Sequence, residues 1–193
     1  MRESIGATWI FGIVIVFVTI FTGYLAFSIN FSKAFAMKDE IIDVLEKYNG
    51  PGNSTSSCSE AGGVSTTTAF CEIYKYMLSV NYNAAGNCYT ITDYLYSHNA
   101  YSHRKWILGV NHAKATVYGD SPDAFPTKRY NYCLVREDQT YSETESNANI
   151  NFSTYRVIVF FSVNINIMNL FADYYVTGET KNITYPADGY LGK

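Results

Sequence analysis

Charge is scarce in this chain. Asp, Glu, Lys and Arg make up 16% of the 193 residues, and the formal net charge is -3. No run of Lys or Arg occurs, although proteins that bind nucleic acid use clustered positive charge to contact phosphates. The composition therefore argues against nucleic acid as a partner. Aromatic residues reach 17%, with 18 tyrosines, which favours uncharged, hydrogen-bonding surfaces.

Catalytic motifs are also missing. The sequence contains no Ser-His-Asp order, nucleophile elbow, glycine-rich phosphate loop or HExxH helix. His98, His103 and His112 follow one another at intervals of five and nine residues, which suits neither a helical nor a hairpin pair of metal ligands. We therefore expect no enzyme activity, no cofactor and no metal site, and we interpret the histidines as surface residues of an aromatic loop.

The absence of charge is most complete near the N-terminus, where none occurs between Glu3 and Lys33. About 20 apolar residues in a helix cross the hydrocarbon core of a bilayer, so Ala7–Ser28 is long enough for a membrane anchor. A cleaved signal peptide is the alternative, but the run is longer than a typical signal-peptide core and no small-x-small cleavage site follows it. The predicted anchor residues are Trp9, Ile10, Phe11, Val14, Val16, Phe17, Phe21 and Tyr24, with Trp9 and Tyr24 suited to the two interfaces.

The predicted helix continues beyond the anchor through residues 29–48, which contain neither Gly nor Pro. Apolar residues spaced three and four apart form one stripe on this extension, namely Ala34, Met37, Ile41, Val44 and Tyr48. Asp43 and Lys47 have the favourable i,i+4 order, and Gly50-Pro51 ends the helix. The stripe predicts one packing partner, either the domain of the same chain or another copy of the helix.

All four cysteines, Cys58, Cys71, Cys88 and Cys133, follow the anchor. None has the paired spacing of a zinc site, and an even number is what disulfides require. Four cysteines allow three connectivities, of which we favour Cys58 with Cys71 and Cys88 with Cys133. Disulfides persist outside the reducing cytosol, so we expect the C-terminal domain outside the cytoplasm. The few Lys and Arg residues that flank the anchor, if counted alone, would indicate the opposite topology.

Strict alternation of apolar residues predicts a strand from Tyr155 to Ile167. The even positions are apolar at first and polar later, so we expect both faces to be covered early and one face later. Residues 129–136 and 173–183 are candidate partner strands, with Tyr130, Tyr132 and Leu134 facing one way, a turn over 168–172, and a polar connection over 137–151. The predicted sheet-core residues are Tyr155, Val157, Val159, Phe161, Val163, Ile165 and Ile167.

These elements predict an α+β protein in three parts. Residues 1–28 form the tail and transmembrane anchor, residues 29–48 the amphipathic extension, and residues 49–193 an extracellular domain that contains the disulfides. In that domain a polar loop over 53–68 precedes a short helix over 68–80, and residues 81–128 form a long aromatic loop. We expect the long N-terminal helix to pack with its amphipathic half across one face of a small antiparallel sheet.

An apolar helix that continues into an amphipathic half and precedes a small antiparallel sheet resembles type IV pilins and pseudopilins. More narrowly, INFSKAFAMKDEIIDVLEKY after the anchor and YRVIVFFSVNINIMNLFADYYVTGETKNI near the C-terminus look like TadE-like proteins of Gram-positive bacteria. The chain departs from the pilin leader pattern, because the fifth residue after Gly6 is Phe11 and not Glu. The resemblance implies a single-pass membrane protein that forms or assembles a surface appendage.

Two classes of function follow. The first is a structural or assembly subunit of a cell-surface appendage, whose N-terminal helix contacts the lipid bilayer and other pilin-like or secretion-system subunits. The second is an anchored binding module, in which a Tyr-rich loop over residues 89–118 recognises a glycan or a protein, because rigid aromatic side chains supply binding energy efficiently.

Overall fold

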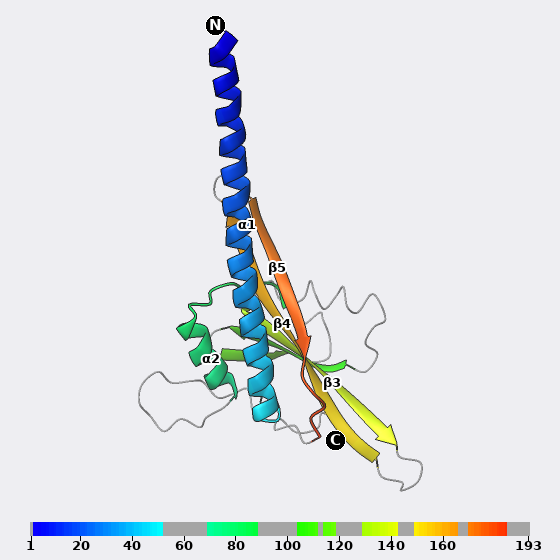
Figure 1. Ribbon diagram of the computed structural model, residues 1–193. Coiled ribbons are helices and arrows are strands. Elements are labelled where there is room, and N and C mark those ends of the chain that lie inside the picture. The colour runs from blue at the N-terminus through cyan, green and yellow to red at the C-terminus, as the bar shows by residue number, and fades with distance from the viewer. Residues whose placement is uncertain are drawn as a thin grey trace.

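The computed structural model describes residues 2–51, 69–88, 104–111, 114–118, 129–142, 149–165 and 170–184. These residues form a long N-terminal helix, a short second helix and one antiparallel sheet, which confirms the predicted α+β class (Figure 1). The elements, in chain order, are α1 (Arg2–Lys47), α2 (Ala69–Ser79), β1 (Arg104–Asn111), β2 (Lys114–Tyr118), β3 (Tyr132–Ser142), β4 (Asn149–Ile165) and β5 (Leu170–Glu179).

α1 is one uninterrupted helix of 46 residues, about 70 Å long at 1.5 Å per residue. Its N-terminal part projects beyond the sheet, and its C-terminal part lies against β4 and β5 (Figure 1). The helix ends where Asn49 and Gly50 adopt positive φ angles of 55° and 115°. The Gly50 N–H donates to the carbonyl of Leu45 at 2.8 Å, which satisfies a helix-end acceptor. The helix end expected at Gly50-Pro51 is therefore confirmed.

Within the described residues the sheet has five strands in the order β2-β1-β3-β4-β5, and every neighbouring pair is antiparallel. β3 and β4 pair from Tyr132 opposite Val159 to Ser142 opposite Asn149. β4, with 17 residues, continues past the end of β3 and pairs with β5 as far as Ile165 opposite Leu170. The end of the β4–β5 pair therefore extends furthest along α1 (Figure 1).

Three predicted loop regions are wrong in part. The predicted aromatic loop over 81–128 contains the hairpin of β1 and β2, and the predicted polar connection over 137–151 belongs mainly to β3 and β4. Residues 137–151 are mostly polar and the apolar residues of β1 do not alternate, so neither segment has the pattern of a half-buried strand, but their backbones pair in register. The turn expected over 168–172 is shorter, because β5 already begins at Leu170.

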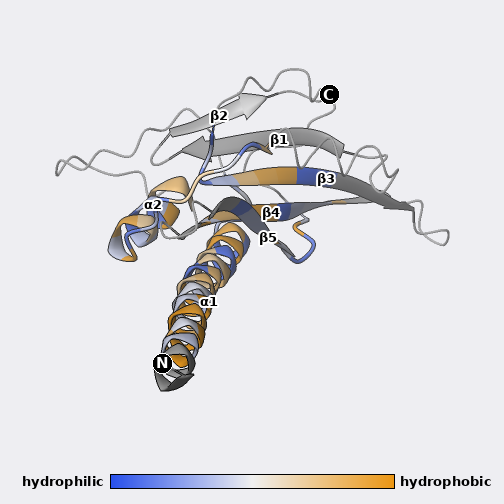
Figure 2. Ribbon diagram, turned by 90° about the horizontal axis from the view of Figure 1, so that it is seen from above, coloured by the Kyte–Doolittle hydropathy of each residue, from blue (hydrophilic) through white to orange (hydrophobic). Residues whose placement is uncertain are grey.

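The core on the α1 side of the sheet contains the predicted stripe. Ala34, Met37 and Ile41 are completely buried, Val44 is almost so, and Tyr48 is half-buried. They pack with α2 and with the odd-numbered side chains of β4, while β1 and β2 form the opposite edge of the sheet (Figure 2). The partner of the stripe is thus the domain of the same chain. The buried β4 residues in this core are Tyr155, Val157, Val159, Phe161 and Val163.

The opposite face of the sheet has a smaller core that contains Ile158 and Phe160 of β4. Burial of these even positions confirms that β4 is covered on both faces over part of its length. Tyr130 also lies in this second core, although it was predicted to share a face with Tyr132 and Leu134. The reason is local: Tyr130 precedes β3 and forms an isolated bridge with Gly86, so the alternation of β3 does not extend to it.

Candidate functional site: the projecting half of α1 and its junction with the sheet

The projecting half of α1 is an exposed apolar surface. All eight predicted anchor residues are exposed, from 51% for Val14 to 72% for Trp9. By length and composition this helix can cross a membrane. Its threonines fit such a surface, because the hydroxyls of Thr19 and Thr22 donate to the carbonyls of Ile15 and Val18 at 2.8 and 2.9 Å. These polar groups therefore need no partner from outside the helix.

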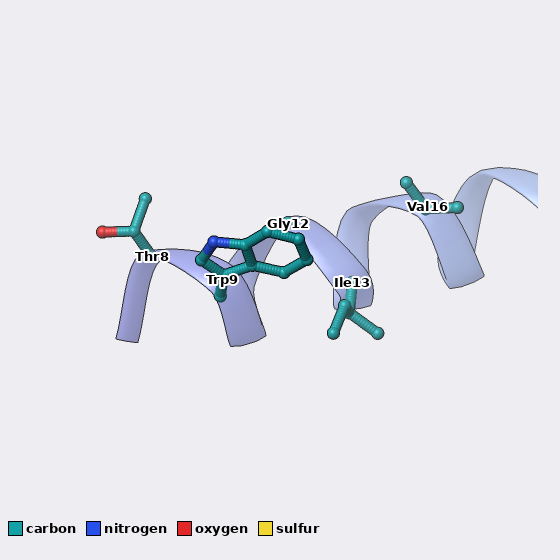
Figure 3. Close-up of a pocket in the computed structure, with 5 residues that line it drawn as sticks. All are labelled: Thr8, Trp9, Gly12, Ile13 and Val16. Atoms are coloured by element: carbon teal, nitrogen blue, oxygen red, sulfur yellow. The ribbon is translucent and has the colours of Figure 1, made fainter. Parts of the chain in front are cut away.

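A notch interrupts this surface at Gly12. The notch is lined by Thr8, Trp9, Ile13 and Val16 (Figure 3). Nothing lies within 4 Å of the position that a Cβ atom would occupy at Gly12. Small residues on apolar helices allow the backbones of two helices to approach closely. The notch is therefore a point on the projecting half where another helix can approach α1 closely.

Aromatic rings join the projecting half to the sheet. The Phe27 ring lies 5.7 Å from both the Phe161 ring of β4 and the Tyr174 ring of β5, with edge-to-face geometry in each case. Phe31 contacts the Phe161 ring in the same manner at 5.7 Å. Next to Phe31, the side-chain amide of Asn30 donates to the carbonyl of Ser162 at 3.1 Å. Edge-to-face pairs are a favoured arrangement, so α1 meets the sheet in a fixed orientation.

Beyond this junction the buried stripe holds α1 against the domain. Leu45 is fully buried and belongs to the same core, although the predicted stripe omitted it. Its position four residues after Ile41 is the signal that identifies it in the sequence. Gly178 of β5 also lies close to α1, because a Cβ atom there would come within 2.7 Å of Ile42 Cδ1 and 2.9 Å of Lys38 Cδ.

Two ionic contacts fasten the C-terminal end of α1. Glu46 accepts from the Lys181 backbone N–H at 2.8 Å and from Lys181 Nζ at 3.0 Å. The backbone hydrogen bond is the main cause that lowers the pKa of Glu46, and the side-chain bond adds to it. Lys47 Nζ contacts both carboxylate oxygens of Glu72 in α2, at 2.7 and 3.0 Å. The i,i+4 partner Asp43 was expected for Lys47, but Glu72 offers both of its oxygens across the helix pair.

The predicted disulfide between Cys88 and Cys133 is present, with the two Cα atoms 6.0 Å apart. Both cysteines are fully buried in the second core, where they tie the segment after α2 to β3. Cys71 is also disulfide-bonded. Cys58 lies outside the described residues, so its pairing with Cys71 remains a prediction.

Other predicted sites fall partly or wholly outside the described residues. His98, His103 and His112 lie there. Of the Tyr-rich loop predicted over residues 89–118, residues 104–111 and 114–118 form β1 and β2 and the rest lies outside the described residues. Ile167 also lies outside, and Ile165 is described for its backbone only. In the part of the chain that is described, no three His, Cys, Asp or Glu residues gather to hold a metal ion.

The chain matches no family model, and neither curated proteins nor solved structures contain a match to it.

Proposed function

We propose that this protein is a membrane-anchored, pilin-like subunit, akin to TadE-like proteins, that forms or assembles a cell-surface appendage. The observation that supports this proposal is the division of a single helix into two surfaces. One half of α1 is exposed and apolar, and the other half is a core element of its own domain. A helix divided in this way connects the domain rigidly to the lipid or the neighbouring helices that surround the projecting half of α1.

The burial of α1 favours a structural spine over a simple tether. A tether needs no contact with the domain it carries, whereas Met37, Ile41 and Leu45 are completely buried. The ring contacts of Phe27 and the Glu46–Lys181 contact fasten the helix near both ends of its contact with the sheet. The projecting half is therefore presented at one angle, as regular packing of neighbouring helices requires.

The proposed partners are the lipid bilayer and other pilin-like or secretion-system subunits that pack against α1. In lipid, helices associate through close van der Waals packing, which the Gly12 notch permits. We place the domain outside the cytoplasm, because the Cys88–Cys133 disulfide is stable in an oxidising compartment.

Helix association in membranes tests this proposal. Full-length protein labelled at its C-terminus with donor or acceptor dye is reconstituted into liposomes, and energy transfer is measured as the protein density is varied. We expect transfer above the random-collision level, reduced by Gly12→Leu because the added side chain fills the notch. Val14→Leu, elsewhere on the same exposed helix, is the matched control and should have little effect. Transfer at the random level at every density would contradict a subunit that assembles through α1.

A further inference from the structure

A second stretch without charge lies beside the uncharged part of α1 between Glu3 and Lys33. Between Arg156 and Asp173 the sequence contains no Asp, Glu, Lys or Arg, and this interval includes the end of β4 and the start of β5. β5 runs in the same direction as α1, since Tyr174 contacts Phe27 while Lys181 contacts Glu46. The end of the β4–β5 pair therefore points along α1 toward its apolar N-terminal half (Figure 1).

The charge-free parts of helix and sheet stop at one common level. In β5 the first charged residue is Asp173, which pairs in register with Ser162 of β4 and binds Arg129 at 2.8 Å. Ser162 in turn accepts the hydrogen bond from Asn30 of α1, and Lys33, the first charge on the helix after Glu3, follows one turn later. Beyond this level, toward the N-terminus of α1, none of the three elements carries a charge until Glu3.

The sheet extends well past that level. Leu170 precedes Tyr174 by four residues, which is about 13 Å of strand and corresponds to about nine residues of helix. Gly23 and Ala26, on the N-terminal side of Phe27, are half-buried. Trp9 and Tyr24 suit the two interfaces of the span, and Leu170, level with about residue 18 of α1, then lies about 9 Å inside the interface at Tyr24. The end of the β4–β5 pair consequently lies beside the last part of that span.

We propose that the end of the β4–β5 pair, residues 163–165 and 170–172, enters the interfacial layer of the bilayer that α1 crosses. The protein then contacts lipid through both α1 and the end of the β4–β5 pair, and the sheet stands at a fixed angle to the membrane. This inference rests on the proposed membrane anchoring of α1. Within the described residues β5 is an edge strand, and open sheet edges do not occur in lipid-exposed hydrocarbon. The strand ends therefore reach the headgroup and upper acyl region and stop there.

The test places a single tryptophan at Leu170 of the full-length protein, with Trp9 and Trp106 changed to Phe. The variant is reconstituted into liposomes whose lipids carry bromine on the upper acyl chain. Leu170→Trp should emit at shorter wavelength, lose most of its fluorescence to the bromolipid and resist aqueous acrylamide. Thr177→Trp, at an exposed position further along β5, is the matched control and should respond to acrylamide alone. In the unmodified protein, a photoactivatable lipid should crosslink to peptides that contain the end of β4 or the start of β5.

The outcomes separate the two proposals. Protein that does not associate with liposomes at all overturns both the anchoring by α1 and the lipid contact of the sheet. If the Leu170→Trp variant associates, but its fluorescence is quenched by acrylamide and not by bromolipid, the anchor is kept and the sheet contact is overturned. Resistance to both quenchers, with no lipid crosslink in the unmodified protein, shows that protein covers the strand ends and also overturns the sheet contact.

Discussion

Replacing Ile41 by Ala tests whether α1 is a structural spine that packs into the domain or only a tether that carries it. Ile41 is completely buried and lies in one core with α2 and the odd positions of β4. The substitution removes three carbons, which at 0.8 kcal/mol each gives about 2.4 kcal/mol of transfer free energy. The cavity left behind raises the expected loss of stability to about 2–5 kcal/mol. For a domain of this size, that loss lowers the melting temperature by roughly 4–20 °C.

Thermal unfolding of the full-length protein in detergent micelles, followed by near-ultraviolet circular dichroism, measures this effect. Ile29→Ala is the matched control, because Ile29 is on the same helix and 57% exposed. We expect the control to shift the melting temperature very little. Equal and small shifts for both variants would refute the reasoning, because they would show that α1 contributes no packing energy to the domain.

Four further predictions concern the buried core, the Glu46–Lys181 contact and the Cys88–Cys133 disulfide. Val159→Asp should lower the unfolding free energy in denaturant titrations by about 3–5 kcal/mol, because the charge has no partner in the core. An unchanged unfolding free energy would contradict the placement of Val159 on the buried, α1-facing side of β4. Gly86→Ala should cost about 1–3 kcal/mol in the same assay, because a Cβ atom would overlap the aromatic ring packed against this glycine. Glu46→Gln should destabilise the protein near pH 7. The difference in stability between the two proteins should disappear as the pH falls from about 5 through the lowered pKa of Glu46, because protonation of the carboxyl removes the charge that Lys181 pairs with. A difference in stability that persists at low pH would assign the effect to packing. Cys88 and Cys133 should react with a membrane-impermeant thiol reagent on intact cells only after a membrane-impermeant reductant has been added, and loss of their disulfide should cost about 4 kcal/mol by the loop-closure estimate; thiols that become labelled only in permeabilised cells would place the domain in the cytoplasm.

The sequence predicts the parts of this fold that bury alternating or helical apolar patterns. Ile41 and its neighbours recur at helical spacing, and Val157 to Phe161 alternate in the central strand, so burial left a periodic trace in both. The distal half of β3 is polar, as loops often are, and the apolar residues of β1 are consecutive and do not alternate, so neither segment shows the period of a half-buried strand. Glu46 and Lys181 are far apart in the sequence, so no local sequence pattern could predict their contact.

The candidate site also has one part that the sequence predicts and one part that it does not. The long apolar helix could be predicted, because its uncharged segment has the length and composition that a membrane span requires. The junction of Phe27 with Phe161 and Tyr174 could not, because it depends on how far the sheet extends along α1. That extent is set by the register of β4 with β5, which hydrophobic pattern alone does not fix when residues are apolar at successive positions.

In the proposed arrangement one rigid helix runs without a hinge from the membrane into the core of the domain. Electron–electron dipolar spectroscopy tests it most directly, with nitroxides attached through unnatural amino acids at Ile10 and Thr177, so that the cysteines stay paired. Both positions are exposed, and in lipid nanodiscs the rigid spine predicts a single narrow distribution of distances between the labels. A broad distribution would contradict the account, because it would show that the projecting half of α1 moves independently of the sheet.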